Sequence, residues 1–286
     1  MSGKGIVILY HGGCPDGFGG AYAAWKKFGD SAEYIPVKHQ RPAPENLEGR
    51  SLYFVDFCYP KDIMDSFVAK AKSVAVLDHH MSAKDVVQSM PAFVFDNRRS
   101  GATIAWNYFH PDTPVPKLLT YVEDGDLYTF KLPDSRAILS YTYARPFRFD
   151  EWDMLAGRLE TDEGYAEFVR VGKIYAEHFA ILVEQIASRA SLVSFEGYEC
   201  YLVGSAGLFA SDVGNLLARI KPPMGIILMM SADTLSVSLR SDASVDVSAI
   251  AKKYGGGGHP QASGFDIKWG DPLPWTVLKE HENPRH

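Results

Sequence analysis

Three consecutive side chains that can bind a metal ion, Asp78, His79 and His80, follow a short apolar run at residues 74–77. Imidazole and carboxylate ligands together suit borderline cations such as manganese, zinc and iron. A strand that ends in these residues would deliver all three side chains to one edge of a sheet. The alternative is a strand-end carboxylate with two surface histidines, and so short a motif does not decide between the two. The rest of the chain does.

Two other apolar segments end in the same way. Residues 5–10 predict a buried strand that leads into His11 and, through a glycine-rich turn, to Asp16. Residues 51–55 predict another strand, which is followed by Asp56. Because the ends of neighbouring strands lie about 5 Å apart, side chains at these ends can share one or two metal ions. A tight turn with an incidental histidine is the competing interpretation of residues 11–17.

The elements that must position these residues alternate between strand and helix, which predicts a doubly wound, mostly parallel α/β sheet. In such sheets ligands bind outside the carboxyl ends of the strands. Asp124 and Asp126, in or after a helix that begins near Pro116, are further candidate ligands, although we interpret Asp126 as part of a solvated acidic turn. The further segments expected in this half are strands at 74–77 and 93–96 and helices at 21–28, 63–71 and 104–109.

After Arg189 the pattern changes to short strands, which predicts a smaller α/β domain with a mixed sheet. Four consecutive glycines at 255–258 cost much conformational entropy to order. We therefore expect the backbone of Gly256, Gly257 and Gly258 to approach a ligand closely, with His259 and an arginine beside it, as a cradle for a terminal phosphate. A flexible linker is the alternative. The elements expected here are strands at 190–195, 198–204, 225–231 and 234–240 and helices at 211–220 and 247–254.

The expected domains are thus residues 1–150, a helical linker at 151–190 and residues 191–286. A net charge of −6 argues against a protein that coats long nucleic acid, but it allows a short phosphorylated substrate held by a few local contacts. Three widely spaced cysteines suggest a reducing compartment. No apolar run approaches the roughly 20 residues that span a bilayer, so we expect a cytoplasmic protein without a membrane partner. Whether it forms a homodimer stays open.

Taken together, these motifs resemble the DHH phosphoesterase superfamily, in the branch of nanoRNases and 3′-phosphoadenosine-phosphate phosphatases with a DHH domain and a DHH-associated C-terminal domain. The segments that carry the resemblance run in the family's order along almost the whole chain: 11–17, 54–56, 77–80, 100–103, Asp124, 237–241 and 255–259. The resemblance implies a phosphodiesterase or phosphomonoesterase with two manganese ions.

The resemblance also implies roles for individual residues. The implied metal ligands are His11, Asp16, Asp56, which would bridge the two ions, His79 and Asp124. Asp78 and His80 would act in catalysis, as an orienting residue and as a phosphate-side or acid–base group. The implied substrate-binding residues are Arg240, Gly256, Gly257, Gly258 and His259, to which we add Arg99 as a candidate.

One departure from the family concerns its first motif, which usually carries two aspartates two residues apart. Here only Asp16 is present, and Cys14 or Phe18 takes the other place, depending on the alignment. One ion is then short of a ligand, is held by Cys14 or binds more weakly, so occupancy of the second manganese site is open.

The expected function is manganese-dependent hydrolysis of very short oligonucleotides, such as the 5′-phosphorylated dinucleotides pGpG and pApA, to mononucleotides. The C-terminal cradle would grip one end of the substrate across an interdomain cleft and so limit its length. The alternatives are a phosphatase acting on small phosphorylated nucleotides and a nucleotide-binding sensor with weakened catalysis.

Overall fold

The chain divides into two compact units, residues 1–176 and 177–286, within which the computed structural model describes residues 4–38 and 41–279. Residues 280–286 of the expected C-terminal domain lie outside the described residues. The boundary falls within helix α8 (Asp162–Ala187), which follows helix α7 (Phe149–Leu159). The expected linker therefore contains two helices. None of the helices in the described ranges is long and apolar enough to cross a membrane.

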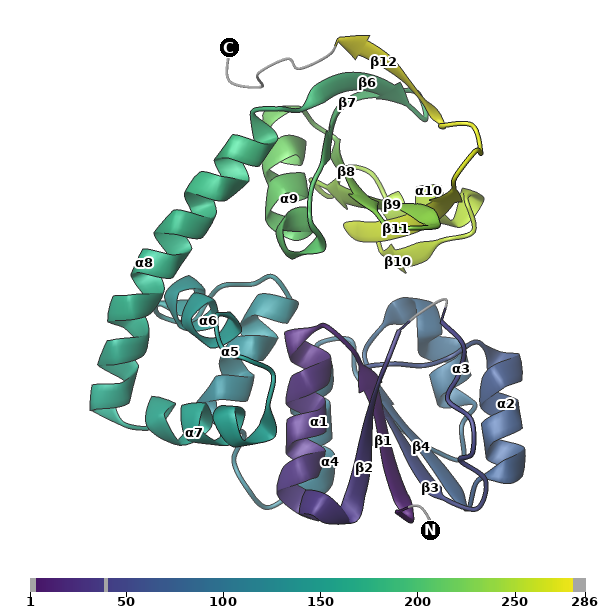
Figure 1. Ribbon diagram of the computed structural model, residues 1–286, viewed down its shortest axis with the longest axis vertical. Coiled ribbons are helices and arrows are strands. Elements are labelled where there is room, and N and C mark those ends of the chain that lie inside the picture. Colours follow the sequence, from purple (N-terminus) through teal and green to yellow (C-terminus); the bar gives the residue numbers. More distant parts are fainter. Residues whose placement is uncertain (1–3, 39–40, 280–286) are drawn as a thin grey trace. The chain divides into compact units, whose positions relative to one another are not determined.

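The first unit is built on a parallel sheet of five strands in the order β2-β1-β3-β4-β5 (Figure 1). Each adjacent pair of strands runs parallel, which confirms the expected doubly wound α/β fold. The strands are β1 Ile6–His11, β2 Ala32–Val37, β3 Ser51–Val55, β4 Ser73–Asp78 and β5 Ala92–Phe95.

Strand β2 was not expected from the sequence. Pro36 lies near the end of this strand and lacks the backbone N–H group that would donate a hydrogen bond to a neighbouring strand. The structure accommodates this proline because β2 is an edge strand and pairs only with β1 in the described sheet.

Helices cover both faces of this sheet (Figure 1). Alternate residues of β1 point to opposite faces, so Val7 and Leu9 join one apolar cluster with α2 and α3, and Ile8 joins the other with α1, α4 and α5. The helices of the unit besides α7 are α1 Pro15–Phe28, α2 Lys61–Lys70, α3 Lys84–Gln88, α4 Gly101–Phe109, α5 Lys117–Asp126 and α6 Ser135–Tyr143.

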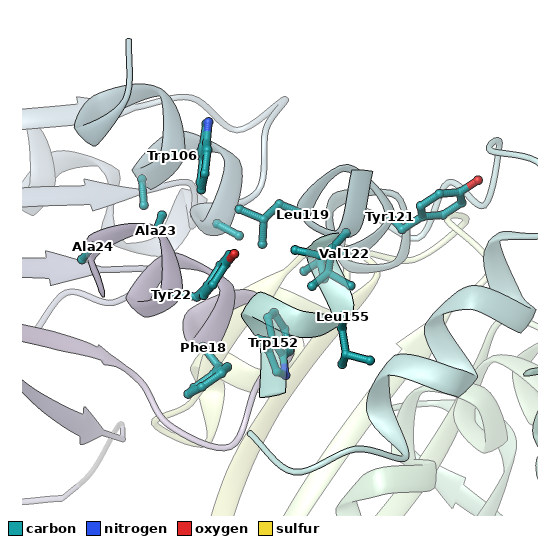
Figure 2. Packing of buried hydrophobic residues seen from close by; sticks show 14 of the residues in the cluster. Phe18, Tyr22, Ala23, Ala24, Trp106, Leu119, Tyr121, Val122, Trp152 and Leu155 are labelled. Carbon is teal, nitrogen blue, oxygen red and sulfur yellow. The ribbon is translucent and has the colours of Figure 1, made fainter. Parts of the chain in front are cut away.

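Aromatic side chains dominate the cluster on the α1 side of the sheet. Phe18 on α1 packs edge-on against Trp152 of α7, with 4.9 Å between ring centroids, and stacks on Phe149 at 5.1 Å. Figure 2 shows Phe18 of α1 next to Trp152 of α7, in the same cluster as Leu119 and Val122 of α5. The cluster therefore fixes α1 and α5, the two helices that carry acidic residues to the end of the sheet.

The second unit is a mixed sheet in the order β10-β11-β9-β8-β7-β6-β12 with helices α9 and α10. Among the described strands of this sheet, only β7 and β8 pair in parallel and the other pairs are antiparallel, which confirms the expected mixed sheet. Its elements are β6 Ser191–Phe195, β7 Tyr198–Gly204, α9 Ala210–Ile220, β8 Met224–Met230, β9 Thr234–Ser241, α10 Val247–Lys253, β10 Gly257–His259, β11 Ala262–Lys268 and β12 Trp275–Lys279.

Candidate metal centre

Three of the residues singled out in the sequence form one row across the carboxyl end of the parallel sheet. Tyr10 pairs with Val55 and Val55 pairs with Leu77, so the next residues along the three strands, His11, Asp56 and Asp78, follow in the same register. The sheet order reverses between β1 and β3, and crevices at such switch points are where ligands bind in doubly wound sheets. The row therefore lies where the fold predicts a site.

Asp56 is the central member of this row. Its backbone has φ 56°, in the left-handed region, which aspartate tolerates better than most residues, and its N–H donates to Leu77 O at 2.8 Å. The carboxylate is 1% exposed. His79 Nε2 lies 3.2 Å from its Oδ1 and His11 Nδ1 lies 3.4 Å from its Oδ2. Burial alone would raise the pKa of this carboxylate, but these two imidazoles are its partners and hold that pKa below the usual range. Within the described residues neither oxygen has a contact with full hydrogen-bond geometry.

Asp16 reaches the same site from the first turn of α1. Its Oδ2 accepts a hydrogen bond from Gly101 N at 2.6 Å and its Oδ1 accepts one from Ala102 N at 2.9 Å. These N–H groups begin α4, where the helix dipole favours a negative charge. The segment 100–103 therefore serves to hold Asp16 in place.

The start of α4 is itself fixed by Glu123 of α5. Oε2 of Glu123 accepts hydrogen bonds from Ser100 N and from Arg99 Nε, each at 2.9 Å. Arg99, a predicted substrate-binding residue, thus has a structural partner, while its side chain is 41% exposed. Its role toward substrate stays a prediction. The sequence analysis did not single out Glu123.

Glycine is required at two positions around the site. A Cβ added to Gly101 would lie 2.5 Å from the Cβ of Asp56 and 3.0 Å from Oδ2 of Asp16. One added to Gly17 would lie 2.2 Å from His11 O. Contacts of 2.5 and 2.2 Å are closer than real Cβ atoms make, so a larger residue would displace Asp56 at position 101 and His11 at position 17.

Asp78 organises the two histidines that follow it. Its Oδ1 accepts hydrogen bonds from the backbone N–H groups of His79 at 2.7 Å and His80 at 3.1 Å, and it lies 2.7 Å from His80 Nδ1. One carboxylate oxygen therefore sets both the turn after β4 and the orientation of the His80 ring. This geometry is that of an orienting residue, the role that the sequence analysis gave to Asp78.

The side chains form three overlapping groups that could each hold a cation. Within each group one ligand atom per residue lies within 4.8 Å of all the others. Asp56 belongs to two groups and His79 to two, so the groups share ligands. The groups are Asp56 with Asp78, His79 and His80; His11 with Cys14 and Asp56; and Asp16 with His79 and Asp126.

The electrostatics of the cluster favour a cation. Burial, followed by the negative charges of Asp126 and Asp56, holds the pKa of Asp16 well above its usual range. Partial burial and the charge of Asp56 outweigh the attraction of His79 and raise the pKa of Asp126 to about 6. Burial alone would lower the pKa of His79, but the surrounding carboxylates raise it to about 10. The negative charge that the neighbouring groups leave uncompensated therefore favours bound protons or a metal ion.

The donor set fits divalent cations. It offers carboxylate oxygens and imidazole nitrogens, which suit manganese, iron and zinc, and the two buried oxygens of Asp56 have no contact with full hydrogen-bond geometry among the described residues. A buried anion of this kind is stable only when paired or when it coordinates a metal. The arrangement can therefore hold one or two divalent ions at the end of the sheet.

The structure does not bring Asp124 to these groups, contrary to expectation. Its oxygens accept hydrogen bonds from Thr129 Oγ1 at 2.5 Å, Lys131 N at 2.8 Å and Leu132 N at 3.2 Å, so it fixes the turn after α5. Asp126 takes its place in the cluster. Residues two apart on a helix point in nearly opposite directions, so only one of the two can face the site.

A sequence signal for Asp126 does exist. Leu119, Val122 and Asp126 are spaced i, i+3, i+7 and so share one face of α5. Both apolar members of this face lie in the cluster that also packs α1. Asp126 is therefore both partly exposed to solvent, with 24% of its side chain accessible, and close to Asp16 and His79, so it is a candidate ligand.

The structure also decides between the two residues in place of the missing aspartate. Phe18 is buried among the rings of α7 (Figure 2) and contributes to the core. Cys14, directly before α1, lies with His11 and Asp56. Of the two residues, Cys14 is the one that lies beside candidate metal-binding side chains.

In the second unit, the predicted phosphate-binding residues share one end of the sheet. Ala262 of β11 pairs with Arg240 on one side and with His259 on the other, so these two side chains lie on the same face. Arg240 Nη1 donates to Ser238 Oγ at 2.8 Å, and its Nη2 donates to Ser211 Oγ of α9 at 2.9 Å.

The glycines before His259 have a structural reason of their own. A Cβ on Gly256 would lie 2.0 Å from Gly264 O, and one on Gly258 would lie 2.6 Å from Ala262 O. Gly258 also has φ 137°. The run is neither a flexible linker nor a free loop, because Gly257 and Gly258 belong to strand β10. A role in binding phosphate stays a prediction.

Parts of the sequence are similar to a known domain family and to two known proteins. Residues 200–273 match the DHHA1 domain. The chain is 30% identical over 284 residues to the uncharacterized protein R106 of Acanthamoeba polyphaga mimivirus, a match that covers 91% of this chain and 66% of that protein. It is 38% identical over 80 residues to the oligoribonuclease NrnB of Bacillus subtilis, covering 28% of this chain and 20% of NrnB.

Two solved structures share the fold. One is the DHH domain of a member of the S1p family of ribosomal proteins, with a TM-score of 0.60, 13% identity and coverage of 93% of this chain and 83% of that one. The other is RecJ of Thermus thermophilus in complex with Mn²⁺, with a TM-score of 0.51, 14% identity and coverage of 92% and 49%. The matched DHHA1 domain, the NrnB segment and the shared fold support the resemblance to the DHH phosphoesterase superfamily.

Replacing Gly101 with alanine should weaken metal binding by about tenfold or more, because overpacking of roughly 1–3 kcal/mol falls on Asp56 and Asp16. Isothermal titration calorimetry with Mn²⁺ measures this. Gly157→Ala is the matched control: it lies in a helix with open space around the new Cβ, and should keep the affinity. Equal affinity in both variants would contradict the close approach at Gly101.

Substituting the two acidic residues of α5 by asparagine should separate their roles. Asp126→Asn should lower Mn²⁺ affinity with little change in the thermal midpoint of unfolding. Asp124→Asn should lower the midpoint, because hydrogen bonds to a charged group contribute about 1.5–3 kcal/mol each, while the affinity changes little. The reverse pattern would show that Asp124 is the ligand.

Metal affinity should fall as the pH is lowered through about 6, because the raised pKa of Asp126 lets protons compete with the cation for its carboxylate. Above that pH the Asp126 carboxylate is ionised and no longer competes for protons, whereas His79, whose pKa is raised to about 10, still binds a proton that the cation must displace. Calorimetric titrations at pH 6 in two buffers of different ionisation enthalpy should report release of protons on Mn²⁺ binding. Binding without proton release would be inconsistent with this electrostatic account.

Proposed function

We propose that this chain is a manganese-dependent phosphodiesterase that hydrolyses very short oligonucleotides, such as 5′-phosphorylated dinucleotides, to mononucleotides. The observation that carries the proposal is the Asp56 carboxylate, which is buried without a contact of full hydrogen-bond geometry from the described residues and is shared by two groups of metal-binding side chains. Asp56 could contribute a ligand atom to a cation held by either group, and two such cations would supply the charge stabilisation used for in-line displacement at phosphorus.

A divalent cation supplies positive charge that offsets the charge of the phosphodiester and makes water a stronger nucleophile at neutral pH. The residues of the chain hold the metal-binding groups in place and orient the side chains that would contact the substrate. Asp16 is fixed by the N–H groups of α4, and Asp78 fixes the ring of His80 through Nδ1. An imidazole oriented in this way can donate a hydrogen bond through Nε2 to a phosphoryl oxygen, and loss of such a donor costs about 10²–10³ in rate.

Two features favour a short nucleotide as substrate. The chain shares an 80-residue segment at 38% identity with the oligoribonuclease NrnB. Its net charge of −6 does not suit a long polyanion. Manganese is supported by the donor set and by the fold shared with RecJ, whose structure contains Mn²⁺.

The proposal gives Arg240 and His259 of the second unit the role of binding a phosphate group of the substrate. Arginine binds phosphate through a planar fork, and the hydrogen bonds to Ser211 and Ser238 set the orientation of this fork. His259 lies on the same face of the sheet and would add a second donor.

The deciding experiment is hydrolysis of a substrate panel with Mn²⁺: a 5′-phosphorylated dinucleotide, a cyclic dinucleotide, a bisphosphorylated adenosine, polyphosphate and long RNA. We expect the linear dinucleotide to turn over fastest. Asp56→Asn should reduce its turnover more than about 100-fold, since even residues that only orient a ligand typically cost 10–100-fold. Asp62→Asn, at an exposed position on α2, removes the same charge and should be unaffected.

Each alternative has its own outcome in this panel. Faster hydrolysis of the bisphosphorylated adenosine would identify a nucleotide phosphatase. Tight dinucleotide binding without turnover, retained in Asp56→Asn, would identify a sensor. Equal or faster turnover of long RNA would exclude selectivity for short substrates.

A further inference from the structure

Cys14 differs in its surroundings from the other two cysteines of the chain. Cys58 and Cys200 are buried in apolar clusters. Cys14 precedes α1 with extended backbone (φ −119°, ψ 136°), is partly buried, and has its Sγ within 4.8 Å of a ring nitrogen of His11 and a carboxylate oxygen of Asp56. Of the three thiols, it is the one that lies among metal-binding side chains.

A second observation points to a ligand at the same place. The Asp56 carboxylate is 99% buried, and neither of its oxygens has a contact with full hydrogen-bond geometry within the part of the chain that the structure describes. One of these oxygens faces Cys14 and His11. Three donors of different chemistry, one nitrogen, one sulfur and one oxygen, therefore converge on one point.

A sulfur ligand changes which metal ion the group of His11, Cys14 and Asp56 would prefer. Thiolate ligands favour zinc and other thiophilic ions, whereas carboxylate and water favour magnesium and manganese. The neighbouring group of Asp16, His79 and Asp126 offers only oxygen and nitrogen. The two halves of the centre thus differ in the hardness of their ligands.

We propose that Cys14 is a metal ligand together with His11 and Asp56, and that it makes this half of the centre select a thiophilic divalent ion such as zinc over manganese. The thiol releases its proton to solvent as the metal–sulfur bond forms. The inference rests on the proposed function in requiring a metal centre. It adds that the centre binds two different kinds of ion, with manganese on the side of Asp16.

Titration with Co²⁺, followed by absorbance, tests the sulfur ligand without any assay of activity. A thiolate bound to cobalt gives a near-ultraviolet charge-transfer band, which oxygen and nitrogen ligands do not. We expect the band in the wild-type protein and in a variant with both Cys58→Ala and Cys200→Ala, where Cys14 is the only thiol left. We expect its loss in Cys14→Ser.

Competition between Zn²⁺ and Mn²⁺ tests the selectivity. Cys14→Asp, which keeps a ligand but replaces sulfur with oxygen, should lower the preference for Zn²⁺ over Mn²⁺ by about tenfold or more. Zn²⁺ preference that is unchanged in Cys14→Asp would overturn the selectivity.

The outcomes separate this inference from the proposed function. Cobalt binding that shows only visible d–d bands in the wild-type protein and in the variant lacking Cys58 and Cys200 would exclude the sulfur ligand and leave the metal centre standing. Failure of any divalent ion to bind would overturn both. Because the variant without the other cysteines leaves Cys14 intact, the result does not depend on how well Cys14→Ser folds.

Discussion

Repulsion among buried carboxylates is the constraint that shapes the first unit. Asp16 and Asp56 are each 1% exposed, and Asp126 lies close enough to raise the pKa of Asp16. Isolated buried charges cost many kcal/mol, so a fold that keeps these groups together must supply compensating charge. The chain supplies part of it through the N–H groups of α4 and the imidazoles of His11 and His79. The remainder is what a divalent cation provides, so binding of metal and stability of this end of the sheet are linked.

The fold brings these carboxylates together and partly compensates their charge mainly through backbone features. Parallel strands place His11, Asp56 and Asp78 in one row because their registers coincide, and the sheet order reverses there. The start of α4 supplies two N–H donors to Asp16, and Gly101 lets that helix approach without displacing Asp56. Each of these features is rigid, because it depends on the register of the strands and on the position of α4. A site built on such elements holds its ligands more closely than one carried by loops.

Much of this architecture could be predicted from the sequence, and the errors have physical causes. Continuous apolar runs mark buried parallel strands, so β1, β3 and β4 and the residues at their ends were expected. Asp124 and Asp126 could not be told apart by residue type, because both are aspartates on one helix and only the helical phase decides which faces α1. Strand β2 was not predicted because proline is unfavourable in most strands. Pro36 is tolerated here because β2 lies at the edge of the sheet. Cys14 and Phe18 were separable only through packing, since Phe18 belongs to a core that forms from distant segments.

The glycine run of the second unit shows how one sequence feature can satisfy two demands. Glycines at 256 and 258 are required by the close approach of β11 alone, so their presence does not by itself indicate a ligand. The proposed phosphate binding in this unit would instead depend on Arg240 and His259, which share a face because both are in register with Ala262. Arg240 packs across Gly214 of α9, where an added Cβ would lie 2.6 Å from its Cγ. An arginine whose stem is confined in this way loses little side-chain entropy on binding an anion, which is compatible with the role proposed for Arg240 in binding phosphate.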